Sequence, residues 1–248
     1  MAQKLDEFKI SDWALIVDLL GTASTMAENV AWIQAIENIL TVIEASVHET
    51  INMTNPDRNI HTYQYGDTVN FFSDDPQELM LLAVILQKKL FQMDQLAKMG
   101  LAYGGVYDLT QINFIKKLTN QHGRLVAQCL AGRATSKGHL LMGKIKGPRI
   151  FIDEEVPIAP NHKAWERFSS PKVKIPDVGF PRAEVAWWRQ VNDIDADVKN
   201  RIAKLDMEIQ ARTQSNINAD PAEKRRIDSL AARKEHLEAF RNVLDNDL

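Results

Sequence analysis

The apolar run at residues 13–20 contains a single charged side chain, that of Asp18. A run of this length and hydropathy is typical of a strand that is buried on both faces, although a short buried helix would show the same composition. A carboxylate inside such a strand is costly unless a cation or a hydrogen-bond donor compensates it. Asp18 is therefore either a binding residue or the cap of the helix that follows the strand.

A second acidic residue, Asp67, is predicted at the tip of a hairpin. Residues 60–65 and 68–73 are rich in β-branched and aromatic side chains, and only Gly66 and Asp67 separate them. Two such runs joined by two residues, one of them glycine, favour a tight β-hairpin. Turn chemistry alone explains Asp67. If the strands are neighbours, however, Asp18 and Asp67 together can bind a hard divalent cation.

The remaining elements predict an α+β fold. They are a helix from Met26, a helix from Pro76 that Gly100 closes, a strand at 101–107, a short helix at 125–135 and a strand at 148–153. Caps and proline at the first turn support the helix starts. The order β-α-β-β-α-β, followed by a further α-β, indicates a ferredoxin-like sheet with helices on one face.

The C-terminal part of the chain differs in composition. Four prolines lie between positions 157 and 176, and each one removes a backbone hydrogen-bond donor. Beyond them, apolar residues recur at spacings of three and four, and Asp220 begins a second helix as part of a capping box. The sequence therefore predicts a domain at 1–156, a proline-rich connector at 157–181 and a C-terminal helical hairpin at 182–248 that serves packing or dimerisation.

Composition narrows the classes of function. The chain has 248 residues and a formal net charge of -3, whereas nucleic-acid-binding domains usually present a net basic face. Cys129 is the single cysteine, which excludes a disulfide framework and a cysteine-rich zinc module. Neither a signal peptide nor a membrane-spanning run is predicted. We expect a cytoplasmic protein without membrane insertion or direct nucleic acid binding.

Four motifs, in order along the chain, resemble those of the class III nucleotidyl cyclases. They are the aspartate-containing strand and turn at 17–22, the Gly-Asp hairpin at 65–72, the strand at 100–106, and the final helix and strand at 123–134 and 148–152. The strand reads Gly-Leu-Ala-Tyr-Gly-Gly-Val and is similar to the family's Gly-Ile-Ala-x-Gly-x-Val pattern. The resemblance spans residues 11–155. It implies the class III cyclase sheet and a cyclase activity.

The resemblance also implies a two-metal site. Asp18, the carbonyl of Leu19 and Asp67 would bind two Mn²⁺ or Mg²⁺ ions per site. The implied reaction is attack of the ribose 3′-hydroxyl on the α-phosphorus, which yields a 3′,5′-cyclic nucleotide and pyrophosphate. Because sites of this class form between two protomers, a homodimer with the site at the subunit interface is implied. The backbone amides that would bind the triphosphate are those of Leu20, Gly21 and Thr22.

One departure from the family concerns base recognition. Members that act on purines usually have a lysine four residues before the hairpin aspartate, and here that position is Tyr63. A phenol crowds a purine and can hydrogen-bond a smaller pyrimidine, although Tyr63 also suits an ordinary hairpin. The chain thus most resembles the uridylate and cytidylate cyclases of bacterial Pycsar anti-phage systems. This implies UTP or CTP as substrate, with UTP favoured, and cyclic UMP read by a separate cyclic-nucleotide-sensing effector protein.

A second departure leaves transition-state stabilisation partly unexplained. The family's asparagine and arginine, four residues apart on the final helix, fall near Ala127 and Ala131, and neither residue matches. The role does not transfer securely to Arg124, Gln128 or Arg133. Three alternatives therefore stay open, namely a cytidylate or adenylate cyclase, a catalytically silent cyclase-like scaffold, and, least favoured, a palm-type polymerase fragment.

Overall fold

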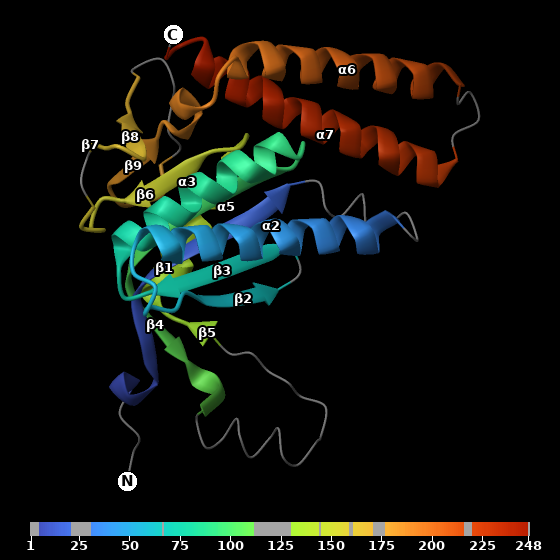
Figure 1. Cartoon of the computed structure of the whole chain (residues 1–248). Coiled ribbons are helices and arrows are strands. Elements are labelled where there is room, and N and C mark those ends of the chain that lie inside the picture. Colours follow the sequence, from blue (N-terminus) through green and yellow to red (C-terminus); the bar gives the residue numbers. More distant parts are fainter. Residues whose placement is uncertain are drawn as a thin grey trace, which may run out of the picture.

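A mixed β-sheet runs through the computed structural model of the chain, which describes residues 5–20, 31–65, 67–111, 130–143, 145–158, 161–170, 177–215 and 220–247 (Figure 1). The strands are β1 (Lys9–Leu20), β2 (His61–Tyr65), β3 (Thr68–Ser73), β4 (Leu96–Asp108), β5 (Leu130–Ala131), β6 (Ile150–Asp153), β7 (Asn161–His162), β8 (Trp165–Phe168) and β9 (Arg182–Val185). The helices are α2 (Ala31–Met53), α3 (Pro76–Gln92), α5 (Arg133–Gly143), α6 (Ile194–Ser215) and α7 (Pro221–Leu244), with short 3₁₀ turns η1 (Leu5–Phe8), η2 (Leu109–Gln111) and η3 (Trp187–Gln190).

The strand predicted from the apolar run lies in the middle of this sheet. The strand order is β2-β3-β1-β4-β6-β9-β8-β7, and β5 pairs with β4. Strand β1 is antiparallel to both β3 and β4, whereas β4 and β6 are parallel. The predicted hairpin is confirmed as β2 and β3, which pair from His61 opposite Phe72 to Tyr65 opposite Thr68.

Helices α2 and α3 cover one face of the sheet. Leu15 and Val17 of β1 are fully buried against this layer, together with Leu79 and Leu82 of α3. Asp75 caps α3 by accepting a hydrogen bond from the backbone N–H of Gln77, with Pro76 at the first position. The sequence predicted this start because an aspartate before a proline supplies an acceptor where the helix has unpaired donors.

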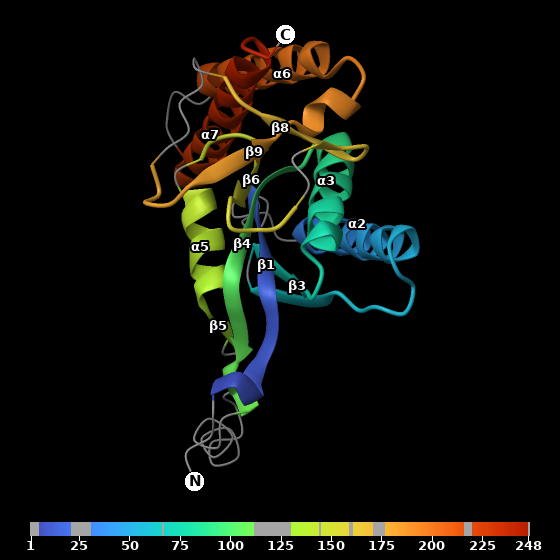
Figure 2. The ribbon, with the colours of Figure 1, turned by 90° about the vertical axis from the view of Figure 1, so that its left-hand side faces the viewer.

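Helix α5 packs on the opposite face of the sheet (Figure 2). The sequence-based expectation that all helices cover one face is therefore wrong. Gly138 of α5 packs directly on the strands, because a Cβ atom there would lie 2.4 Å from Cγ1 of Ile16. Gly100 on β4 makes the matching contact, with its own Cβ position 2.6 Å from the carbonyl oxygen of Gly138. Two glycines therefore allow the helix to approach the sheet closely.

Two sequence-based boundaries are wrong around this contact. Gly100 does not end α3, which stops at Gln92, and Asp94 instead turns the chain with a φ of 61°. Of the short helix predicted at 125–135, residues 125–129 lie outside the described residues, Leu130 and Ala131 form β5, and α5 begins only at Arg133. In both cases an apolar or glycine-containing stretch fits a strand and a helix equally well, and tertiary packing decides between them.

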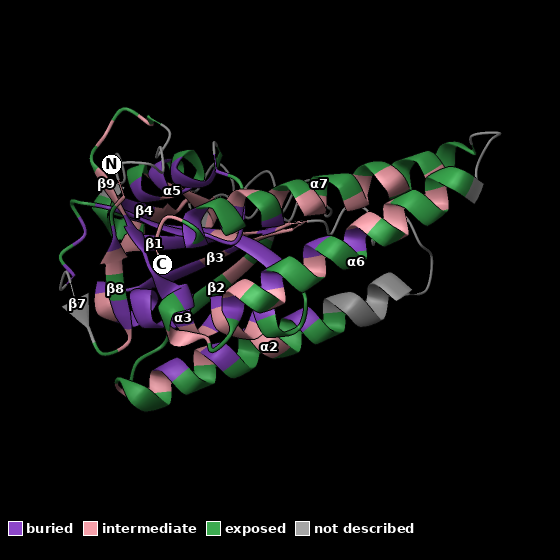
Figure 3. Cartoon of the chain, turned by 90° about the horizontal axis from the view of Figure 1, so that it is seen from above, coloured by how far each residue is buried: buried purple, intermediate pink, exposed green. Residues whose placement is uncertain are grey.

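The C-terminal part contains the predicted helical pair, α6 and α7. Its buried end rests on an aromatic cluster in which the rings of Trp187 and Phe240 stack at 5.4 Å, and the Trp188 ring meets Phe240 at 5.7 Å. Figure 3 shows the remaining length of both helices as mainly a mixture of exposed and intermediate residues. Across the described residues, no helix combines the length and the hydropathy needed to cross a membrane. The α+β class with a C-terminal helical pair is therefore as predicted.

The segment expected as a proline-rich connector contains short strands. Strands β7 and β8 form a small hairpin, and β8 pairs with β9, which in turn pairs with β6. Arg149 and Glu184 join β6 to β9 through a buried bidentate ion pair with 2.6 Å contacts. The sheet thus continues through this part of the chain, while the division into three domains stays a prediction.

Candidate functional site

Asp18 and Asp67 lie next to each other at one end of the central strands. Asp18 of β1 is opposite Thr68, the first residue of β3. Asp67 immediately precedes Thr68, in the turn of the hairpin. The backbone N–H of Leu19 donates a 3.0 Å hydrogen bond to the carbonyl oxygen of Asp67. This bond ties the hairpin turn to the end of β1 and holds the backbone of Asp67 against that of Leu19, the residue after Asp18.

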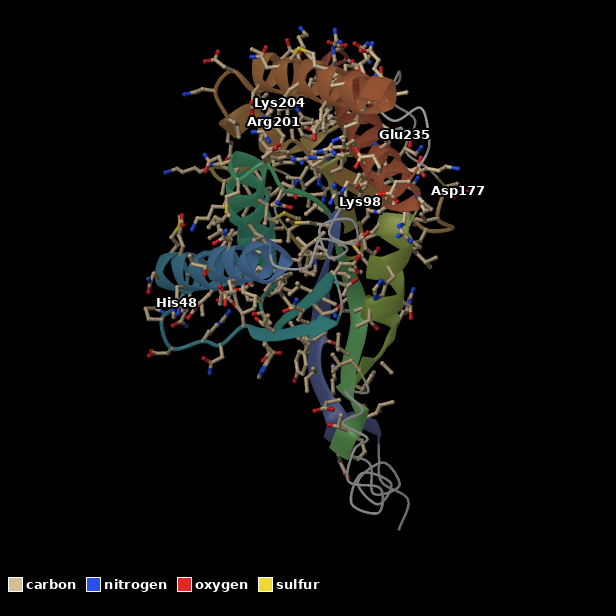
Figure 4. The ribbon with its side chains drawn as sticks, turned by 90° about the vertical axis from the view of Figure 1, so that its right-hand side faces the viewer. His48, Lys98, Asp177, Arg201, Lys204 and Glu235 are labelled. Atoms are coloured by element: carbon tan, nitrogen blue, oxygen red, sulfur yellow. The ribbon has the colours of Figure 1, made fainter. Side chains whose placement is uncertain are left out.

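Lys98 is the cation that compensates Asp18. Its Nζ lies 2.9 Å from Oδ2 of Asp18, and the two side chains are only 13% and 27% exposed. The register explains the contact, because Lys98 on β4 is directly opposite Asp18 on β1. Figure 4 shows Lys98 at the end of the sheet beside α7. The sequence analysis missed this residue, since strand pairing between distant segments carries no local signal.

Helix α7 contacts the sheet close to this ion pair. Nδ1 of His236 accepts a 2.8 Å hydrogen bond from the backbone N–H of Gly147, which requires an unprotonated nitrogen. Burial, and next the positive charge of Lys98, lower the pKa of His236. The imidazole of His236 is therefore neutral, and the positive charge near Asp18 comes from Lys98.

The donor set at this strand end suits a hard cation. Asp18 and Asp67 offer carboxylate oxygens and Leu19 a backbone carbonyl, which are the ligand types that Mg²⁺ and Mn²⁺ accept in proteins. Among the residues that the structure describes, no group of three or more His, Cys, Asp or Glu side chains is placed to hold a metal ion. A cation bound here would therefore need further oxygen ligands from a substrate or from water.

A pocket of about 510 Å³ opens on the same face as Asp18, over β2 and β3. Its floor includes Tyr63 and Asn70, which are paired across the hairpin, and Ile16 of β1 continues the same row. Asp18 belongs to the next row, because residues two apart on a strand point to the same face. The volume is in the range of small-molecule sites.

The N-terminal part of α5 forms the other wall of this pocket. Gly132, Thr135, Ser136 and His139 line it. The buried Lys137 fixes the helix, with its Nζ 2.5 Å from Oδ2 of Asp153. This wall of the pocket is thus mainly polar, and a buried ion pair anchors the helix that carries it. Sequence reasoning missed Ser136 and His139 because the helix that it predicted ends at Thr135, whereas α5 continues to Gly143.

Tyr63 has both an apolar and a polar environment in the pocket. Its ring packs against Phe72 at 5.5 Å with a tilt of 55°. Burial, followed by the negative charge of Asp108, raises the pKa of the Tyr63 phenol. The hydroxyl therefore stays protonated through the physiological range and keeps a hydrogen to donate.

The other predicted site positions have mixed outcomes. Leu20 is the last residue of β1, whereas Gly21, Thr22 and Ala127 lie outside the described residues. Ala131 is in β5 and lines the pocket, so it is not on the final helix as the resemblance suggested. On the described part of α5, the side chains facing the pocket are hydroxyls and an imidazole, not an asparagine and an arginine.

Comparison with known proteins gives similar folds only. No protein-family model and no curated protein sequence matches the chain. The catalytic core of a rhodopsin-guanylyl cyclase with converted specificity, in complex with ATPαS, has a TM-score of 0.46 and 11% identity over 70% of this chain and 92% of that chain. Adenylate cyclase from Trypanosoma brucei has a TM-score of 0.45 and 9% sequence identity, over 70% of this chain and 86% of that chain. The guanylate cyclase domain of RhGC from Catenaria anguillulae, in complex with GTP, has a TM-score of 0.43 and 11% sequence identity, over 70% of this chain and 92% of that chain.

Proposed function

We propose that this protein is a nucleotidyl cyclase that uses Mn²⁺ or Mg²⁺ to convert a pyrimidine nucleoside triphosphate into a 3′,5′-cyclic nucleotide and pyrophosphate. The observation that carries this proposal is the adjacency of Asp18 and Asp67, tied together by the hydrogen bond from the Leu19 N–H to the Asp67 carbonyl. The resemblance of four motifs to the class III cyclases supports it. Both the acidic pair and its spacing on neighbouring strands agree with that resemblance.

The residues at the strand end have distinct roles in this proposal. Asp18, the Leu19 carbonyl and Asp67 would hold two divalent ions, which supply positive charge against the triphosphate and lower the pKa of the ribose 3′-hydroxyl. In the reaction, the ribose 3′-oxygen bonds to the α-phosphorus, the bond to pyrophosphate breaks, and a proton is released. Lys98 is placed to bind anionic phosphate oxygens when it leaves Asp18.

Base recognition is assigned to the pocket over β2 and β3. Tyr63 narrows the pocket with its ring and keeps a protonated hydroxyl that can donate to a pyrimidine carbonyl. We favour UTP over CTP because uracil offers two carbonyl acceptors. The remaining candidates for triphosphate contact, the amides of Leu20, Gly21 and Thr22, follow from the family resemblance.

We infer a homodimer with the site at the subunit interface. The pocket that contains Tyr63 is lined by neither Asp18 nor Asp67. The inference of a dimer rests on the likeness to the class III cyclases, whose sites form between two protomers. A role of the cyclic nucleotide as an anti-phage second messenger, read by a separate effector protein, rests on the likeness to the Pycsar cyclases.

The activity is tested by incubating the purified protein with UTP, CTP, ATP or GTP and Mn²⁺. We expect release of pyrophosphate and cyclic UMP, with CTP the next best substrate, and no product from the Asp67→Asn variant. Turnover of ATP alone would replace the pyrimidine assignment by adenylate cyclase. An Asp67→Asn variant as active as the wild type would refute the metal assignment.

A second candidate function is a catalytically silent binding module. The ion pair between Lys98 and Asp18 favours it, because a structural salt bridge uses the same carboxylate. The two functions differ in their ligands, since a scaffold has no need to bind Mn²⁺ and a triphosphate together. Joint binding of both, measured on the wild-type protein, supports the cyclase over the module.

A further inference from the structure

A second and larger pocket lies on the opposite side of the molecule from Tyr63. It has a volume of about 750 Å³ and is formed where the end of α2 and the middle of α3 meet the turn between β7 and β8. Helices α2 and α3 belong to the layer that covers the other face of the sheet. No residue of the proposed cyclase site lines it.

The lining of this pocket is mainly apolar. Val84 and Trp165 are almost completely buried beneath it, while Ile85 is partly buried and remains in contact with the cavity. Met53 at the end of α2 adds a side chain that is 63% exposed. A thioether and aliphatic groups around a buried indole suit a hydrocarbon or aromatic ligand, since apolar walls bury most of the surface of a bound small molecule.

Two lysines border the apolar wall. Lys88 of α3 and Lys163 in the turn between β7 and β8 both line the pocket, and neither has an ion pair with another described residue. The acidic lining residue, Glu49, is already paired, with its Oε2 2.7 Å from Nζ of Lys89. The uncompensated charge at the pocket is therefore positive, and it comes from two separate elements.

We propose that this pocket binds a small amphipathic acid, with an apolar body against Val84, Ile85 and Trp165 and an anionic group between Lys88 and Lys163. The lysines provide the ammonium donors that a carboxylate, sulfonate or phosphate requires, and their stems extend the apolar surface. A ligand held in this way links α2 and α3 to the β7–β8 turn. It therefore stabilises the folded chain, by an amount that rises with the ratio of free ligand concentration to Kd.

The test uses anilinonaphthalene sulfonate, a fluorescent anionic aromatic probe, on the full-length protein. We expect saturable binding and a raised Tm for the wild type. The Lys88→Glu/Lys163→Glu variant should bind roughly tenfold more weakly, which is the combined effect of two exposed ion pairs. Ala164→Trp, which places bulk at a partly buried position in the pocket lining, should abolish saturable binding. Decanoate should displace the probe roughly tenfold better than decanol, which has the same chain without a charge.

A matched control makes the same charge change elsewhere. Lys224 and Arg225 are exposed on α7 and neither lines the pocket, so Lys224→Glu/Arg225→Glu should leave probe affinity unchanged. The proposal is overturned if the wild type shows no saturable binding, or if the pocket variants, folded by circular dichroism, bind as well as the control. Neither readout depends on cyclase activity.

Discussion

The sheet face under α2 and α3 is closed by aliphatic side chains, whereas the face under α5 is closed only along β1 and β4 and stays open over β2 and β3. On the first face, Leu15, Val17 and Leu82 are fully buried in one continuous cluster. On the second, the contact between Gly100 and Gly138 lets α5 sit close to the strands, and a pocket remains beside it. Asp18 and Tyr63 lie on the open face, where the side chains of the sheet can reach a ligand in the pocket.

Truncating a side chain should lower the free energy of unfolding more on the face under α2 and α3 than on the exposed side of α5. We expect Leu82→Ala, at a fully buried position on α3, to lower the free energy of unfolding by about 2–5 kcal/mol, through lost burial and a cavity. Leu140→Ala on α5, where the side chain is 51% exposed, should change it by less than about 0.5 kcal/mol. Urea unfolding of both variants measures the difference, and equal losses would contradict the comparison.

The open face should instead be sensitive to added volume at the glycine contact. In Gly138→Ala the new methyl group would lie 2.4 Å from Cγ1 of Ile16, so we expect a loss of about 1–3 kcal/mol. Gly143 lies on the same helix, and a Cβ atom added there would have nothing within 4 Å, so Gly143→Ala is the matched control. It should be neutral or slightly stabilising, because alanine has the higher helix propensity. Equal effects of the two substitutions in urea unfolding would refute the close packing of α5.

Changes inside the pocket should affect catalysis more than stability. Tyr63→Phe keeps the ring contact with Phe72 and removes only the hydroxyl, so the free energy of unfolding should change by less than about 1 kcal/mol. If the hydroxyl donates to the base, kcat/KM for UTP should fall roughly tenfold, as for one hydrogen bond. Steady-state kinetics with UTP decide this. An unchanged kcat/KM would remove Tyr63 from base recognition.

The smallest expected effect is the contribution of His236, on α7, to the loss of stability at acidic pH. His236 has a lowered pKa in the folded protein, so the unfolded chain takes up a proton first as the pH falls. Its contribution to stability is present above the ordinary value of 6.5 and is lost as the pH falls from there toward the lowered pKa. Unfolding in urea at pH 7.5 and 5.5 should thus show a smaller pH-dependent loss for His236→Gln than for the wild type. An identical loss would mean that His236 titrates normally.

The local parts of the fold were predictable from sequence. The run around Asp18 and the pair of runs around Gly66 and Asp67 have strong local signals, and both form the predicted strands. The start of α3 at Asp75 and Pro76 was also predictable, because capping depends on residues that are adjacent in the chain.

The non-local parts were not predictable. Lys98 contacts Asp18 because β4 pairs with β1. The position of α5 depends on the contact between Gly138 and Ile16 of β1, two residues that are far apart in the sequence. One signal was available for the pocket, since Thr68 and Asn70 alternate with buried Val69 and Phe71 along β3. Such alternation indicates a strand with one face open to a polar environment.

The central claim is that Asp18 and Asp67 jointly hold divalent cations beneath a nucleotide. Isothermal titration calorimetry of Mn²⁺ into protein saturated with a non-hydrolysable UTP analogue tests it most directly. We predict saturable binding by the wild type and by Asp74→Asn, which changes an exposed aspartate near the same hairpin, and its loss in Asp18→Asn and Asp67→Asn. Mn²⁺ binding of equal affinity in all four proteins would contradict the claim.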